Sequence, residues 1–77
     1  MQDNDGYVVR VVEHCASTLT GGYDGCDIEV MVQSLPAALK LMAVLLERNH
    51  VEQLKEGVEY ARPRAGGRRT VTLRSAP

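Results

Sequence analysis

One segment in the middle of this 77-residue chain, residues 34–49, has the composition and the end signals of an α-helix. Ser34 is a favourable N-cap, and Pro36 suits a first turn because its missing N–H would have no helical partner there. At 100° per residue the apolar side chains cover an arc of about 160°. We therefore expect a helix of about 14 residues that packs on a sheet and whose apolar arc is wider than one sheet face needs. The arc contains Leu35, Ala38, Leu39, Leu41, Met42, Leu45 and Leu46.

Two β-rich segments precede the helix and predict an antiparallel hairpin. Residues 7–15, YVVRVVEHC, are dense in β-branched side chains, and residues 27–34 alternate between apolar and polar positions. The glycines between these segments mark a reversal of the chain. For the apolar faces to coincide, opposite positions must sum to an odd number, because a slip of one residue turns every side chain over.

Two registers of this hairpin satisfy the condition. One places Cys15 opposite Cys26, and the other places Cys15 opposite Ile28. Both registers keep the valine face intact, so the residues alone leave both open.

The part of the chain after the helix predicts a short second helical turn and a second hairpin. Residues 51–57, VEQLKEG, are typical of one or two helical turns closed by Gly57. Residues 58–62 and 69–74 alternate as strands do, and they flank the turn-forming segment 63–67. The expected fold is therefore α+β, with two β-hairpins in the order ββαββ that form a small antiparallel sheet on one main helix.

Chain length predicts a single domain, residues 1–77, because chains usually divide only beyond about 250 residues. We expect residues 1–6 and 75–77 to fray, as chain ends commonly do. A domain this small has marginal stability unless a partner, a metal or a disulfide adds to it.

The charges of the chain are divided between its two ends. Residues 1–34 carry six acidic side chains against one arginine, whereas residues 61–77 carry five arginines and no acid. Such asymmetry is typical of a surface that steers a charged partner. We expect the two charged ends to bind a partner. The candidate partner-binding residues are Tyr23, Asp24, Asp27, Glu29, Arg62, Arg64, Arg68 and Arg69.

The histidines and cysteines lack the spacing of a metal site. Structural zinc sites draw their ligands from closely spaced pairs, but Cys15 and Cys26 are eleven residues apart. The adjacent His14 and Cys15 point to opposite faces of a strand, so they cannot act together as a catalytic pair. The glycine-rich segment before residue 27 precedes a strand and lacks the Lys-Ser/Thr of a phosphate-binding loop. The sequence therefore predicts no metal, no cofactor and no enzymatic activity.

These features favour a non-enzymatic protein-binding module. In size, α+β make-up and charge polarity the chain looks like small phage-encoded inhibitor proteins, anti-CRISPR proteins among them. The resemblance rests on the whole chain and not on a motif, so it assigns no residue role. It implies that the protein blocks a host nucleic-acid-processing complex such as a CRISPR-Cas effector. The alternative hypothesis is a small nucleic-acid-binding protein that uses the arginine-rich hairpin of residues 61–77.

The sequence also predicts a homodimer in the cytoplasm. The wide helix face and the edges of a short sheet both give a second copy a place to dock. The first eight residues have neither the basic nor the apolar part of a secretory signal. The longest stretches without a charged residue have ten residues, too few to span a bilayer. We expect a cytoplasmic protein without membrane contact, in a bacterial host if the gene belongs to a phage.

Overall fold

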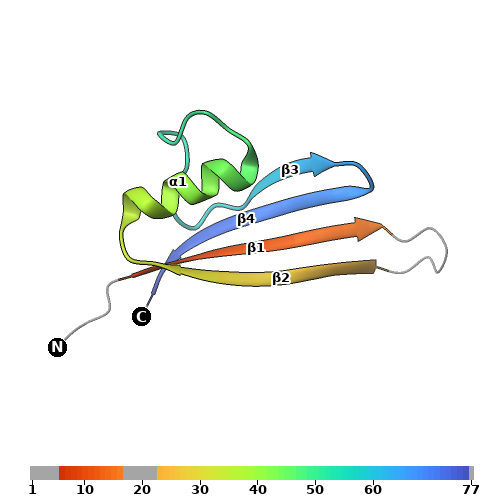
Figure 1. Ribbon diagram of the computed structural model, residues 1–77, viewed down its shortest axis with the longest axis horizontal. Coiled ribbons are helices and arrows are strands. Elements are labelled where there is room, and N and C mark those ends of the chain that lie inside the picture. Colours follow the sequence, from red (N-terminus) through yellow and green to blue (C-terminus); the bar gives the residue numbers. More distant parts are fainter. Residues whose placement is uncertain (1–5, 17–22, 77) are drawn as a thin grey trace.

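The computed structural model of the protein describes residues 6–16 and 23–76. Within these residues the chain forms four strands and one helix (Figure 1). They follow the order ββαββ and build an α+β fold, which confirms the predicted fold class. In chain order the elements are β1 (Tyr7–Ala16), β2 (Tyr23–Val32), α1 (Leu35–Leu46), β3 (Tyr60–Arg64) and β4 (Gly67–Ser75).

The four strands form one antiparallel sheet in the order β2-β1-β4-β3. Each predicted hairpin is present, and the two are joined by pairing of β1 with β4 in the middle of the sheet. β2 and β3 are therefore the two edges. α1 lies on one face and packs mainly on β4 and β1, while the far ends of the strands extend beyond it (Figure 1).

The first hairpin has neither of the two registers expected from the sequence. Val11 lies opposite Ile28, and Cys15 lies opposite Asp24 rather than opposite Cys26 or Ile28. Opposite positions still sum to an odd number, so the apolar faces coincide as predicted. The apolar pattern repeats every two residues, so it determines the face of each side chain but not the shift along the strand.

α1 begins where the sequence predicts and ends earlier. The Ser34 hydroxyl oxygen accepts a hydrogen bond from the Ala37 N–H at 3.3 Å, as an N-cap does. At the other end Glu47 has a left-handed backbone with a φ of 56°, and its N–H donates to the Val44 carbonyl at 3.2 Å. A left-handed residue at this position satisfies the last carbonyls and turns the chain away. α1 consequently has 12 residues.

Of the one or two helical turns expected at residues 51–57, a single turn forms, and it does not extend into a helix. The Leu54 N–H closes one isolated turn, and its side chain is buried. The rest of the segment is held by β3 instead. The Tyr60 hydroxyl accepts a hydrogen bond from the Lys55 N–H at 2.8 Å and donates to the Gln53 carbonyl at 3.0 Å. Because a neighbouring strand satisfies these backbone groups, the segment does not need helical hydrogen bonds.

Three of the residues expected to fray, Gly6, Ser75 and Ala76, belong to the described part of the structure. Residues 1–5 and Pro77 lie outside that part of the chain. Gly6 is buried, and its carbonyl accepts a hydrogen bond from the Ala76 N–H at 2.9 Å. Ser75 belongs to β4. These ends hold each other because β4 pairs with β1 along its whole length.

The core lies between α1 and the two middle strands. The helix turns Met42, rather than Leu41 and Leu45, toward the centre of the core. Leu41 and Leu45 are only half-buried, because α1 lies over β4 and β1 and leaves its flank above β2. The largest fully buried side chains are Val9, Met42, Val71 and Leu73.

Candidate functional site

The order of the strands brings the acidic and basic parts of the chain together. β4 carries arginines and lies beside β1, whose other neighbour is the acidic strand β2. The oppositely charged ends of the chain therefore lie beside each other in the sheet. The sequence could not show this, because the pairing of β1 with β4 joins opposite ends of the chain. Three ion pairs join this basic end to acidic residues of β1 and β2: Arg64–Glu13, Arg69–Glu13 and Arg74–Glu29. Two further ion pairs have other origins, since Arg10–Asp27 lies within the first hairpin and Arg62–Glu47 joins β3 to the end of α1.

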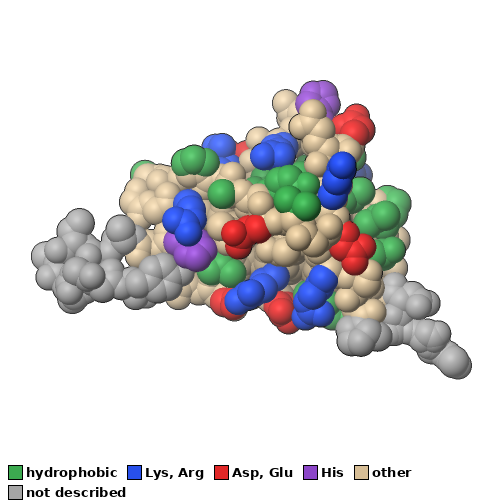
Figure 2. All heavy atoms as spheres, turned by 180° about the vertical axis from the view of Figure 1, so that it is seen from behind, with side chains coloured by type: hydrophobic (Ala, Val, Ile, Leu, Met, Phe, Trp, Pro, Cys, Tyr) green, Lys and Arg blue, Asp and Glu red, His purple; other side chains and the backbone are tan. Residues whose placement is uncertain are grey.

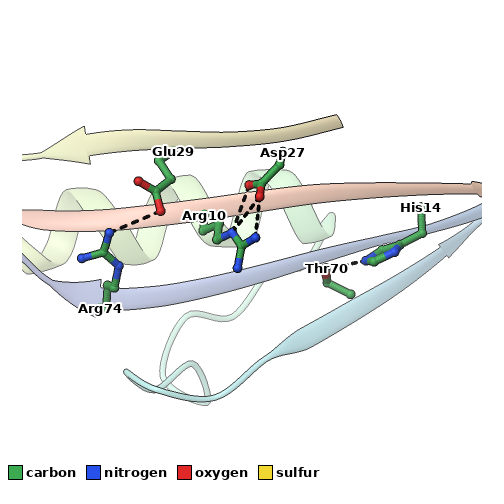
Figure 3. Close-up of polar contacts among 6 residues, drawn as sticks. All are labelled: Arg10, His14, Asp27, Glu29, Thr70 and Arg74. Carbon is green, nitrogen blue, oxygen red and sulfur yellow. Dashed lines mark hydrogen bonds and ion pairs between the residues drawn. The ribbon is translucent and has the colours of Figure 1, made fainter. Parts of the chain in front are cut away.

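Two of these ion pairs lie on the sheet face that α1 leaves uncovered (Figure 3). Arg10 donates from Nε to Asp27 Oδ1 at 3.0 Å, and Arg74 on β4 donates to Glu29 Oε2 at 3.3 Å across β1. The hydrogen bonds from Arg10 lower the pKa of Asp27 from its ordinary value of 3.8. Basic and acidic side chains are interspersed over this face (Figure 2). The charges of Asp27 and Glu29 are thus neutralised within the chain.

Glu13 joins the basic hairpin to the rest of the protein on the opposite face. Its carboxylate pairs with Arg69 and lies 3.5 Å from Nη1 of Arg64. Arg69 also donates from Nη1 to the Leu45 carbonyl at 2.9 Å. These contacts direct two of the candidate arginines toward groups of the same chain.

The eight candidate residues do not gather into one site. Asp27 and Glu29 are on the uncovered face, whereas Arg69 is on the face of α1 with Arg62 and Arg64. Tyr23 and Asp24 begin β2, and their side chains lie outside the described part of the structure. Arg68 lies opposite His14, is exposed, and forms no ion pair with the described residues.

A groove of about 280 Å³ between α1 and β2 is the most distinctive surface feature, and sequence reasoning did not locate it. On the strand side Ile28 is 55% exposed and Val30 is 37% exposed, although both face the same side of the sheet as the core. On the helix side the wall is formed by Leu41 and Leu45. The complete lining consists of Val11, Glu13, Cys26, Ile28, Val30, Leu41, Leu45 and Arg69.

The position of α1 explains why the groove is open. α1 packs on β4 and β1 and makes few contacts with β2, so the apolar side of β2 has no cover. The signal in the sequence was the apolar arc of the helix, which is wider than one sheet face needs. That arc indicates an uncovered flank, but it does not say which strand lies beneath it.

The outer edge of β2 adds free backbone groups to this apolar surface. β2 has ten residues and has no neighbouring strand beyond it among the residues that the structure describes. Every second residue of an edge strand directs its N–H and C=O outward, where they are available to another strand. Groove and edge together form one candidate docking surface, the β2 surface, which comprises the outer edge of β2 and the α1–β2 groove.

A second hollow of about 500 Å³ lies at the end of the sheet, near the turn between β3 and β4. Its lining includes Glu13 and the free, exposed Cys15 and Cys26. The nearby His14 ring nitrogen Nε2 lies 3.2 Å from the Thr70 hydroxyl (Figure 3). Across residues 6–16 and 23–76 no three His, Cys, Asp or Glu side chains cluster as ligands of a metal ion. The Glu13 carboxylate in this hollow is engaged by Arg64 and Arg69.

Comparison with known proteins gives no relative that would assign a function to these surfaces. No family model matches the chain, and neither a curated protein nor a solved structure resembles it significantly. In the described part of the chain no helix has the length and apolar character needed to cross a membrane. The geometry of the β2 surface is therefore the basis for a functional proposal.

Proposed function

We propose that the protein is a non-enzymatic protein-binding module that docks its partner on the β2 surface. The partner contributes an extended segment whose backbone pairs with the edge of β2 and whose apolar side chains enter the groove. The exposure of Ile28 and Val30 carries this proposal, because both side chains would be removed from water by such a segment.

The charges around the groove support a protein partner. Asp27 and Glu29 are paired with Arg10 and Arg74, which reduces the negative charge that a strand approaching β2 meets. Specificity then comes from apolar side chains at alternate positions, as in other cases of strand addition.

The nucleic-acid hypothesis draws less support from the same contacts. Arg62, Arg64 and Arg69 form ion pairs with Glu47 or Glu13. Phosphate binding by these arginines would have to break the ion pairs first, which reduces the free energy available for binding.

Two narrower expectations remain predictions. One is that the partner belongs to a host nucleic-acid-processing complex, which the protein inhibits as phage-encoded inhibitors do. The other is a cytoplasmic location, and the free thiols of Cys15 and Cys26 are typical of a reducing compartment.

The docking proposal is tested by one substitution in the groove and a matched one outside it. Ile28→Lys places a charge in the groove, and Val44→Lys places the same charge on the outer side of α1, where Val44 is 67% exposed. Tagged variants are isolated from native cells after cross-linking, and bound proteins are quantified by mass spectrometry. We expect Ile28→Lys to reduce the bound partner by about tenfold or more, because a buried ammonium loses its hydration, and Val44→Lys to retain it.

Full retention of the partner by Ile28→Lys would overturn the docking site. The nucleic-acid hypothesis is tested in parallel by gel-shift titration against mixed DNA and RNA at two salt concentrations. Binding that weakens steeply with salt, and disappears when Arg64, Arg68 and Arg69 are changed to Ala, would favour that hypothesis instead.

A further inference from the structure

β2 is suited to pair with another copy of itself. It contains no proline, and its side toward α1 carries Ile28, Val30 and Val32 at alternate positions. We propose that the segment bound on the β2 surface is β2 of a second copy, which makes the protein a homodimer with one continuous sheet. This inference rests on the proposed docking function of that surface, and it names a second copy of the chain, in place of a host protein, as the partner bound there.

Symmetry restricts how two copies of β2 can pair in an antiparallel manner. The two-fold axis that relates them stands normal to the sheet and keeps every residue on its own face. Opposite residues of an antiparallel pair share a face, so an even-numbered residue must lie opposite an even-numbered residue. The apolar positions of one β2 therefore meet the apolar positions of the other, and the strand is complementary to itself.

The acidic residues of β2 select one register among those that symmetry allows. A pair centred on Ile28 places Asp27 opposite Glu29 of the second copy, and a pair centred on Glu29 places that carboxylate opposite its own copy. Both arrangements are destabilising because like charges face each other. A pair centred on Val30 places Glu29 opposite Met31 and avoids the repulsion. A pair centred on Asp27 places that carboxylate opposite its own copy. A pair centred on Cys26 has no facing carboxylates, but it places Asp24 opposite Ile28 and leaves Val30 outside the paired segment. The Val30-centred pair is therefore the register without facing carboxylates that sets both Ile28 and Val30 opposite apolar residues.

The Val30-centred dimer covers the exposed apolar side chains of β2. Ile28 of one copy lies opposite Val32 of the other, and the two Val30 side chains meet at the axis. Both α1 helices lie on the same face of the continuous sheet, with their Leu41 and Leu45 flanks toward the axis. The two grooves then face each other across the new strand pair. This arrangement gives the wide apolar arc of the helix a partner that the single chain does not supply.

Sedimentation velocity of the full chain between about 1 and 500 µM measures the dimer directly. We expect a concentration-dependent change from 8.4 kDa to twice that mass. Val30→Lys brings two ammonium groups together at the axis, so it should raise the dimer dissociation constant by about tenfold or more, whereas Val44→Lys leaves it unchanged. A mass of 8.4 kDa throughout the concentration range would overturn the dimer.

Disulfide cross-linking tests the register, and it does not depend on how well the lysine variants fold. Cys15 and Cys26 are first replaced by serine. In that background Val30→Cys places two thiols opposite each other at the axis, whereas Ile28→Cys places each thiol opposite a valine. Mild oxidation should yield covalent dimers with Val30→Cys and few with Ile28→Cys. The reverse result, or no covalent dimer with Val30→Cys, would overturn the Val30-centred pair.

The dimer and the docking proposal fail in different ways. A monomer that binds a different protein, and loses it through Ile28→Lys, would overturn the dimer while the docking site stands. A monomer whose bound proteins are unaffected by Ile28→Lys would overturn both.

Discussion

The two edges of the sheet differ in how far other parts of the chain cover them. β3 is the shorter edge, with five residues, and includes Pro63, which has no N–H to offer another strand. Its side chains are tied to neighbouring elements: the Tyr60 hydroxyl holds the segment after α1, and Arg62 pairs with Glu47 at the end of α1 at 2.7 Å. Contacts within the same chain thus cover β3, and Pro63 makes this edge a poor partner for another strand.

β2 is the opposite case. Asp27 and Glu29 are neutralised on the uncovered face, but Ile28 and Val30 on the other face are exposed. A sheet edge is therefore open to pairing with another strand when the helix packs over other strands. This holds even if the edge strand alternates between apolar and polar residues as regularly as a covered strand does. Three measurements on single variants test this difference between the two edges and the contacts that hold the sheet together.

The largest difference is expected between Tyr60→Ala on β3 and Ile28→Ala on β2. Tyr60→Ala removes a half-buried ring and two hydrogen bonds, so it should lower the free energy of unfolding by about 2–4 kcal/mol. Ile28→Ala should cost less than about 1 kcal/mol in the monomer, because the side chain is largely in water already. Urea unfolding below the dimer dissociation constant measures both. Equal costs would mean that the two edges are equally covered.

A smaller loss of stability is expected from a substitution where the two hairpins meet. A Cβ atom at Gly67 would overlap the backbone carbonyl of His14 on β1. Gly67→Ala should therefore force β4 away from β1 and lower the free energy of unfolding by about 1–3 kcal/mol. The exposed neighbour provides the control, since Arg68→Ala should change stability by less than about 0.5 kcal/mol. Thermal unfolding of both variants measures the difference, and a neutral Gly67→Ala would show that the hairpins are not held this closely.

The smallest expected effect on stability comes from the ion pair between Asp27 on β2 and Arg10 on β1. Hydrogen bonds from Arg10 lower the pKa of Asp27 from 3.8, so the pair stabilises the fold at higher pH. That contribution is lost as the pH falls from about 3.8 through the depressed pKa of the folded state. In an NMR titration of the Asp27 carboxyl, Arg10→Gln should raise the pKa, and the control Arg74→Gln should not. An unchanged pKa in Arg10→Gln would contradict the pairing.

The amino-acid sequence predicted which helices and strands form better than it predicted where each of them begins and ends. Ser34 and Pro36 marked the start of α1 correctly, because capping depends on local geometry. Its end was missed, because Glu47 adopts a left-handed conformation that few residues other than glycine favour. The hairpin register was missed for a different reason: every shift of two residues keeps the same apolar face.

The candidate site was less predictable than the fold. The sequence correctly presented Asp27 and Glu29 as charged residues of a strand, but it could not show that Arg10 and Arg74 neutralise them. It also indicated a helix with an uncovered apolar flank. That flank could not be placed over β2 without the packing of α1 on β4 and β1.

Local patterns in the chain specified the ββαββ order, the face of each strand residue and the start of the helix. These features depend on neighbours a few residues apart, so the apolar period and the capping residues are sufficient to specify them. The pairing of β1 with β4, the choice of ion pairs and the open edge of β2 emerged only from the packing of the whole fold. Those outcomes depend on contacts between distant parts of the chain, whose geometry no local pattern encodes.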